Sequence, residues 1–270
     1  MRNMEKYPWT REAAQSFWSQ HPCSGLRFSS MNELIEYRKR KDPIIQVFLN
    51  DLAYSIDDYV LDIGCGQGAD MTDMRRHFPQ TFGGDLSMGA LKNALCLNPE
   101  LAGGIMQFDA RYLPFQSESF NAVYSHGVIH HSPNIEKSVE EIHRVLRPGG
   151  RGRVLLYRKY SPKGIAVRIV RRLFTSKVFE RLFRRVFRNQ GSAVDELFLC
   201  PVMDMHTHAE INRLFHQFAE VKIEACHIGL AHVLFIMGLP IDNAIYKFVS
   251  AVEKLFERLF GFYWIVTFRR

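Results

Sequence analysis

The pattern of hydrophobic and polar positions alternates between two periods over residues 59–157. Short apolar runs typical of buried strands lie at 59–63, 81–85, 104–108, 120–125 and 152–157. The stretches between them carry apolar residues at three- and four-residue steps, which is typical of amphipathic helices. This repeated strand–helix order predicts an α/β fold, with a parallel sheet and helices on both of its faces.

Outside this alternation the pattern predicts mainly helices. Two helical stretches are expected within residues 1–55, one around Trp18 and one from Met31 to Leu49. The second half of the chain is expected to contain helices at 209–218 and 243–260 and strands at 218–225 and 263–268. There is no internal repeat, so the sequence favours a single α/β unit with helical additions.

Several residues mark where these elements begin and end. Ser87 is expected to cap the helix that runs to Leu97. Thr207 and Glu210 match a capping box at the start of helix 209–218. Arg147-Pro-Gly-Gly150 is expected to stop the helix over 134–146 and to form a turn before the fifth strand.

The first strand leads into a glycine-rich turn, Asp62-Ile-Gly-Cys-Gly-Gln-Gly68. Glycine permits positive φ and has no Cβ, so a ligand can lie directly against the main chain. Three glycines at every second position differ from the G-x-G-x-x-G fingerprint, which holds a dinucleotide pyrophosphate at a helix N-terminus. The spacing therefore points away from hydride-transfer chemistry.

Polar residues also follow the next three strands. Asp85 ends the second strand roughly 20 residues after the glycine turn, a spacing that suits a carboxylate binding ribose hydroxyls. Asp109 follows the third strand and can accept from an adenine amino group, and His126 follows the fourth. Because the carboxyl ends of parallel strands meet at one edge of a sheet, these side chains are expected to lie together.

Three longer runs carry a family resemblance: Asp109-Ala-Arg-Tyr-Leu-Pro-Phe115, Ser119-Phe-Asn-Ala-Val-Tyr-Ser-His-Gly-Val-Ile-His-His131 and Glu140-Glu-Ile-His-Arg-Val-Leu-Arg-Pro-Gly-Gly150. With the glycine turn, they resemble the class I S-adenosylmethionine (SAM) methyltransferases over residues 58–157. The resemblance is to the ubiquinone/menaquinone-biosynthesis-like branch (methyltransferase type 11 domain), which acts mainly on small molecules and lipids. Asn121 stands where many relatives have Asp, a change expected to be tolerated.

The resemblance implies a Rossmann-like, seven-stranded, mostly parallel sheet whose last strand is antiparallel. Residues 218–225 and 263–268 would be the sixth and seventh strands. Helical insertions are expected after the fifth strand and between the sixth and seventh. The implied organisation has four parts: an N-terminal helical lid at 1–55, the SAM-binding core at 56–158, a cationic insertion or cap at 159–205, and a segment completing the sheet at 206–270.

The resemblance also implies where SAM would lie. Asp62, Gly64 and Gly66 would hold the methionyl end, and Cys65 lies within the same loop. Asp85 would hold the ribose with Leu86 beside the adenine, and Asp109 and Ala110 would hold the adenine. His126 would line the methyl-transfer cavity. Tyr37 or Arg38 is expected either to meet the SAM carboxylate from the N-terminal segment or to belong to a packing helix.

Methyl transfer from SAM is a displacement at an activated sulfonium, so the protein mainly positions the reactants and excludes water. A general base is needed only where the acceptor arrives protonated. The candidates are His126, His130, His131 and Tyr157, although the His-His pair also suits a structural helix start. No metal is expected, because the histidine clusters lack a third carboxylate at ligand spacing.

Composition also bears on the cellular compartment of the protein. The five cysteines are scattered, which favours a reduced, cytoplasmic protein over a disulfide scaffold. The first residues lack the apolar run of a signal peptide. The longest nearly apolar run, 228–241, is too short to cross a bilayer.

The net charge of +7 is concentrated in one segment. Residues 163–188 hold nine Lys and Arg and one acid, with apolar residues at helical spacing between them. Region 163–190 is therefore expected to be a cap over the active site, a contact with an anionic membrane, or a plain surface helix. Nucleic-acid binding is not expected, because the charge is confined and no aromatic stacking platform accompanies it.

Together these features predict a SAM-dependent methyltransferase that acts on a small-molecule or lipid-like acceptor and releases S-adenosylhomocysteine. The alternative is a protein of the same fold that binds SAM without catalysis, as a partner or regulator. The sequence does not encode which acceptor atom receives the methyl group.

Overall fold

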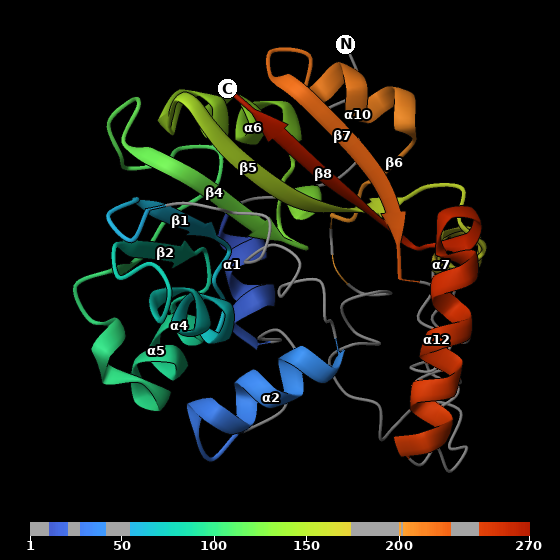
Figure 1. Ribbon diagram of the computed structural model, residues 1–270, viewed down its shortest axis with the longest axis horizontal. Coiled ribbons are helices and arrows are strands. Elements are labelled where there is room, and N and C mark those ends of the chain that lie inside the picture. The colour runs from blue at the N-terminus through green and yellow to red at the C-terminus, as the bar shows by residue number, and fades with distance from the viewer. Residues whose placement is uncertain (1–10, 21–27, 42–54, 174–199, 201, 228–242) are drawn as a thin grey trace.

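The computed structural model describes residues 11–20, 28–41, 55–173, 200, 202–227 and 243–270 (Figure 1). Its centre is one sheet with the strand order β3-β2-β1-β4-β5-β8-β7. The strands are β1 Val60–Ile63, β2 Thr81–Asp85, β3 Ile105–Gln107, β4 Phe120–His126, β5 Leu146–Arg158, β7 Ala219–Cys226 and β8 Tyr263–Arg269. β1 to β5 are parallel, whereas β8 is antiparallel to both β5 and β7. The predicted seven-stranded Rossmann-like sheet is confirmed.

Helices cover both faces of this sheet (Figure 1). They are α1 Arg11–Gln20, α2 Met31–Lys41, α4 Ala69–Arg75, α5 Met88–Leu97, α6 Ile135–Val145, α7 Pro162–Leu173, α10 His208–Leu214 and α12 Asn243–Phe260, with the short 3-10 helices η2 Pro99–Leu101 and η3 Ile129–His131. Alternate residues of a strand face opposite sides. Leu61 and Ile63 accordingly pack with α6 and α10, while Val60 packs with α4 on the other face.

Local chemistry starts the helices where the sequence predicts. The hydroxyl of Ser87 accepts from the Ala90 N–H at the start of α5. Asn134 caps α6 in the same way, and Thr207 and Glu210 form the predicted capping box of α10. These caps satisfy backbone N–H groups that have no partner within a helix.

Three boundaries differ from the prediction. Arg147-Pro-Gly-Gly150 ends α6 as predicted, but these residues form an irregular part of β5, with φ +77° at Gly149, and not a turn before it. The Gly149 N–H donates to the Arg270 carbonyl, and the Arg270 N–H donates to the Gly150 carbonyl. α10 ends at Leu214, four residues before the predicted end. A two-residue strand, β6 Met205–His206, pairs with β5 outside the main order and was not predicted, because two residues carry no period.

Some predicted features lie partly or wholly outside the described residues. The helix expected from Met31 is described to Lys41, and residues 42–49 lie beyond it. Of the cationic region 163–190, the structure describes only the part within α7. Within the described part of the chain, no helix combines the length and apolar character needed to cross a bilayer.

Candidate active site

A pocket continuous with solvent lies at the carboxyl ends of β1 to β4, and its open space is about 1330 Å³. All the residues predicted for the cofactor line it: Tyr37, Arg38, Asp62, Gly64, Cys65, Gly66, Asp85, Leu86, Asp109, Ala110 and His126. They come from four strand ends and from α2, and the sheet topology brings them together. Their contacts with a ligand stay predictions.

The glycine turn forms the floor of this pocket. Gly64 has φ +81°, and a Cβ at this position would lie 2.2 Å from a methyl group of Val128. The N–H groups of Gly64 and Cys65 both donate to the Gly84 carbonyl, which fixes the turn against β2. Burial raises the pKa of the Cys65 thiol well above its usual range, so this side chain is a neutral packing group.

Asp85 joins the glycine turn to the start of α5. One carboxylate oxygen accepts from the Gly66 N–H at 3.0 Å and the other from the Ser87 N–H at 2.8 Å. Burial raises the pKa of Asp85, while these backbone hydrogen bonds act in the opposite direction. Each carboxylate oxygen has a second lone pair, so Asp85 can hold the turn and still accept from hydroxyl groups of a ligand.

Asp62 is a buried carboxyl group in the wall of the pocket, only 2% exposed. Its Oδ2 atom has no hydrogen-bond partner within the part of the chain that the structure describes. Burial raises the pKa of Asp62 well above its usual range, and the nearby charge of Asp70 adds to the effect. A buried, underused acceptor of this kind suits a cationic or hydrogen-bond-donating ligand.

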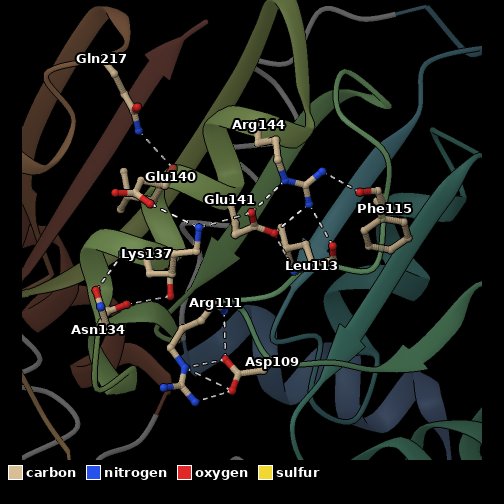
Figure 2. Close-up of polar contacts among 12 residues, drawn as sticks. Asp109, Arg111, Leu113, Phe115, Asn134, Lys137, Glu140, Glu141, Arg144 and Gln217 are labelled. Carbon is tan, nitrogen blue, oxygen red and sulfur yellow. Dashed lines mark hydrogen bonds and ion pairs between the residues drawn. The ribbon is translucent and has the colours of Figure 1, made fainter.

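Asp109 lines the pocket and is paired with Arg111, as Figure 2 shows. Arg111 donates to both carboxylate oxygens, with Nη2 2.7 Å from Oδ2. Burial raises the pKa of Asp109, but the hydrogen bonds and charge of Arg111 outweigh this, so the pKa lies below its usual value. Asp109 is therefore ionised and positioned before any ligand arrives.

The loop after Asp109 is anchored to α6 (Figure 2). Glu141 accepts from the Leu113 N–H at 2.8 Å, and Arg144 donates to the carbonyls of Leu113 and Phe115. Arg144 also donates to Glu141, and this hydrogen bond keeps the pKa of Glu141 low. Glu141 and Arg144, three residues apart on α6, therefore hold the loop after Asp109 in place.

The N-terminal helices contribute the opposite wall. Arg38 of α2 pairs with Asp70 of α4 through both Nε and Nη2, with an Nη2–Oδ2 distance of 3.0 Å. Trp18 of α1 lines the pocket, and its ring lies 4.8 Å from that of His131. The Ser87 hydroxyl donates to the Trp18 carbonyl, which ties α1 to the start of α5.

The four candidate bases lie in two places. His126 and His131 line the pocket, whereas His130 and Tyr157 are not among its lining residues and contact each other, with ring centroids 4.0 Å apart and ring planes tilted by 44°. Burial lowers the pKa of His130 well below its usual value, so its imidazole is neutral. His131 Nδ1 lies 2.7 Å from the Val202 carbonyl, which only accepts, so this nitrogen carries the proton.

Comparison with known protein families identifies the region that contains the first five strands. The sequence profile of the family described as "Methyltransferase domain" matches residues 61–154, the region from β1 into β5. This region is a class I SAM-dependent methyltransferase domain. The ubiquinone/menaquinone-like branch stays a prediction.

Named relatives of the methyltransferase domain act on several acceptors. The fatty-acid O-methyltransferase of Mycolicibacterium smegmatis is 31% identical over 139 residues, which is 49% of this chain and 48% of that protein. A phthiotriol/phenolphthiotriol dimycocerosates methyltransferase of Mycobacterium ulcerans is 35% identical over 107 residues, 38% of each chain. The chain thus spans about half or less of the length of these curated relatives.

The geranyl diphosphate C-methyltransferase of Streptomyces coelicolor A3(2) has the same fold over nearly the whole chain. Its structure, in complex with Mg²⁺, geranyl diphosphate and S-adenosylhomocysteine, covers 97% of this chain and 98% of its own. The TM-score is 0.59 and the sequence identity is 15%. At this identity the likeness shows the fold alone.

The sequence did not predict several residues that line the pocket, among them Asp70 and Trp18. Asp70 pairs with Arg38 two residues after the glycine turn, and Trp18 is predicted only as part of a helix. The position of Asp70 in the first turn of α4 was the available signal, since that turn follows the glycine loop directly. No local signal marks Trp18, because α1 reaches the pocket only through tertiary packing.

Replacing Asp62 with asparagine is expected to stabilise the ligand-free methyltransferase domain as pH rises. Where folding raises the pKa of a carboxyl group, the free energy of unfolding of the protein falls as pH climbs from the unfolded toward the folded pKa. Asp62→Asn removes that loss. If the loss is about 1 kcal/mol near pH 8, the melting temperature should rise by about 2–4 °C there, and by less near pH 5.5. Calorimetric melting at both values checks this.

Asp57→Asn is the matched control, because Asp57 is an exposed carboxylate in the loop before β1. It should leave the melting temperature unchanged at both values. An Asp62→Asn protein that melts below wild type at both pH values would show that the carboxylate stabilises the free protein.

Proposed function

We propose that this chain binds SAM in the pocket and transfers its methyl group to a small-molecule or lipid-like acceptor. The main support for this proposal is that the glycine turn, Asp85 and Asp109 line one pocket of a class I methyltransferase domain. The products are the methylated acceptor and S-adenosylhomocysteine, and the acceptor loses a proton where it arrives protonated.

The residues of the pocket fit the parts of SAM. The absence of a side chain at Gly64 lets Val128 pack directly against the glycine turn, and both residues line the pocket. Asp62 offers a buried carboxyl group to the methionyl ammonium, and Asp85 offers lone pairs to the ribose hydroxyls. Asp109, held by Arg111, would accept from the adenine amino group. SAM supplies an activated methyl group, and these residues supply its orientation.

Two kinds of support favour a lipid-like acceptor. The relatives named above include methyltransferases for a fatty acid and for phthiotriol dimycocerosates. The pocket also presents apolar side chains next to its histidines, among them Trp18, Val128 and Ile129. An apolar wall excludes water from the methyl-transfer region and favours an acceptor with a hydrocarbon part.

Among the candidate bases we assign proton acceptance to His131. With the proton on Nδ1 donated to Val202, the neutral ring has its basic lone pair on Nε2. His131 lies in the pocket wall against Trp18, whereas His130 and Tyr157 are not among the lining residues. The Val202 carbonyl would also stabilise the imidazolium formed when His131 takes a proton.

The test is S-adenosylhomocysteine release from SAM with a panel of long-chain hydroxy lipids, long-chain fatty acids and small polar amines. Release is expected with a lipid-like member and not with the amines. For a hydroxyl acceptor, His131→Gln should lower kcat about 100-fold or more with an unchanged SAM dissociation constant. His216→Gln, at an exposed histidine, is the control.

Two results would contradict the proposal. SAM binding without release for any acceptor would favour the non-catalytic alternative. Release confined to small amines would refute the lipid-like acceptor while leaving the methyltransferase assignment in place. An unchanged kcat in His131→Gln would remove this residue as the base.

A further inference from the structure

The last helix of the fold presents its apolar face to solvent. In α12, five large apolar residues are exposed at three- and four-residue steps: Val252, Leu255, Phe256, Leu259 and Phe260. Leu255 is 77% exposed and Leu259 is 64% exposed. Residues at this spacing lie on one side of a helix and form a continuous stripe. Contiguous exposed apolar surface of this kind marks an interaction site.

The two acidic residues in the second half of α12 face the protein, unlike those of an ordinary surface helix. Glu253 is buried and Glu257 is half-buried, so both carboxylates lie on the protein side. Lys254 and Arg258 are exposed beside the apolar stripe. The exposed surface of residues 251–260 is therefore apolar and cationic, with no exposed acid.

The start of α7 lies near Phe262, two residues after α12, and the end of β5 contacts α12 itself. Lys163 Nζ is 4.6 Å from the ring centroid of Phe262, and Arg158 Nη1 donates to the Arg258 carbonyl at 3.2 Å. Figure 1 shows both helices at the same edge of the molecule. α7 exposes Ile169, 58% accessible, beside the exposed Arg168.

α7 is also strongly cationic. It carries Lys163, Arg168, Arg171 and Arg172 and no acid. The guanidinium of Arg168 lies 5.5 Å from the ring centroid of Tyr160, an exposed residue just before the helix. Exposed Tyr and Arg side chains next to apolar ones are typical of surfaces at a membrane–water interface.

We propose that α12 and the first turns of α7 form a docking face for anionic lipid membranes. The stripe of α12 would enter the boundary between headgroups and acyl chains, and the Lys and Arg side chains would meet lipid phosphates. A membrane fits better than a second copy of the chain, because pairing two such faces would bring like charges together. The inference goes beyond the proposed function, since lipid docking needs no catalysis.

The test is co-sedimentation of the full chain with two vesicle types, phosphatidylcholine alone and phosphatidylcholine mixed with phosphatidylglycerol. The protein is expected to bind the mixed vesicles, and the bound fraction is expected to fall as the salt concentration rises. Leu255→Gln combined with Leu259→Gln should weaken that binding at least about tenfold, because both side chains would otherwise bury apolar surface. Ile56→Gln, at a residue 64% exposed before β1, should leave it unchanged.

Three outcomes would overturn the docking face. These are no pelleting with either vesicle, equal pelleting of wild type and the double leucine variant, and a concentration-dependent dimer that the leucine variant abolishes. The last would assign the stripe to a second copy of the chain. SAM titration of the same samples keeps this test separate from the proposed function, because the variant lies outside the pocket.

Discussion

Gly64→Ala is expected to lower the free energy of unfolding by about 2–5 kcal/mol. Gly64 has φ +81°, a conformation that costs a residue with a side chain about 1–2 kcal/mol. The new Cβ would also lie 2.2 Å from Val128 Cγ2, an overlap that costs about 1–3 kcal/mol to relieve. Urea unfolding of the wild type and the variant measures the sum.

Two further variants separate these costs. Gly103 has nearly the same φ, +82°, but a Cβ there has nothing within 4 Å, so Gly103→Ala should cost only about 1–2 kcal/mol. Val128→Ala in the Gly64→Ala background should recover only part of the packing cost, because the Cβ of residue 128 would still lie 2.8 Å from the new Cβ. Equal losses in Gly64→Ala and Gly103→Ala would mean that Val128 moves aside freely.

Asp85→Ala is expected to weaken SAM binding by about 1.5–3 kcal/mol, because a ligand loses hydrogen bonds to a charged group. This corresponds to a rise in the dissociation constant of about 10- to 150-fold. The structure adds a second cause, since Asp85 also accepts from the N–H groups of Gly66 and Ser87 and so holds the glycine turn. Calorimetric titration of the variant gives the change.

Asp85→Asn separates the two causes. The amide oxygen can still accept from one backbone N–H, whereas the negative charge is gone. Binding in this variant should lie between wild type and Asp85→Ala, and the exposed Asp57→Ala should match wild type. A dissociation constant that Asp85→Ala leaves unchanged would show that the ribose does not lie at Asp85.

The parts of the fold that depend on local chemistry could be predicted from the sequence. β2 at Thr81–Asp85 and α12 at Asn243–Phe260 have the predicted bounds, because strand and helix periods are properties of consecutive residues. The cap at Ser87 follows equally local rules. The parallel core then gathers the strand ends, so the residues of the pocket were predictable as a group.

What the sequence did not predict depends on contacts between distant segments. Pro148-Gly149-Gly150 belongs to β5 because Arg270 forms hydrogen bonds with it from more than a hundred residues away. The pairing of Arg38 with Asp70 joins helices separated by the glycine turn. The two adjacent histidines differ for the same reason. His131 contacts Val202 and Trp18 and lines the pocket, whereas His130 contacts Tyr157 and does not line it.

The most direct test of the cofactor assignment is a calorimetric titration of the full chain with SAM, followed by the same titration with NADH. The glycine spacing, Asp85 and Asp109 predict saturable one-to-one binding of SAM, displaced by S-adenosylhomocysteine, and no saturable binding of NADH. Saturable binding of NADH with none of SAM would contradict the assignment of this pocket.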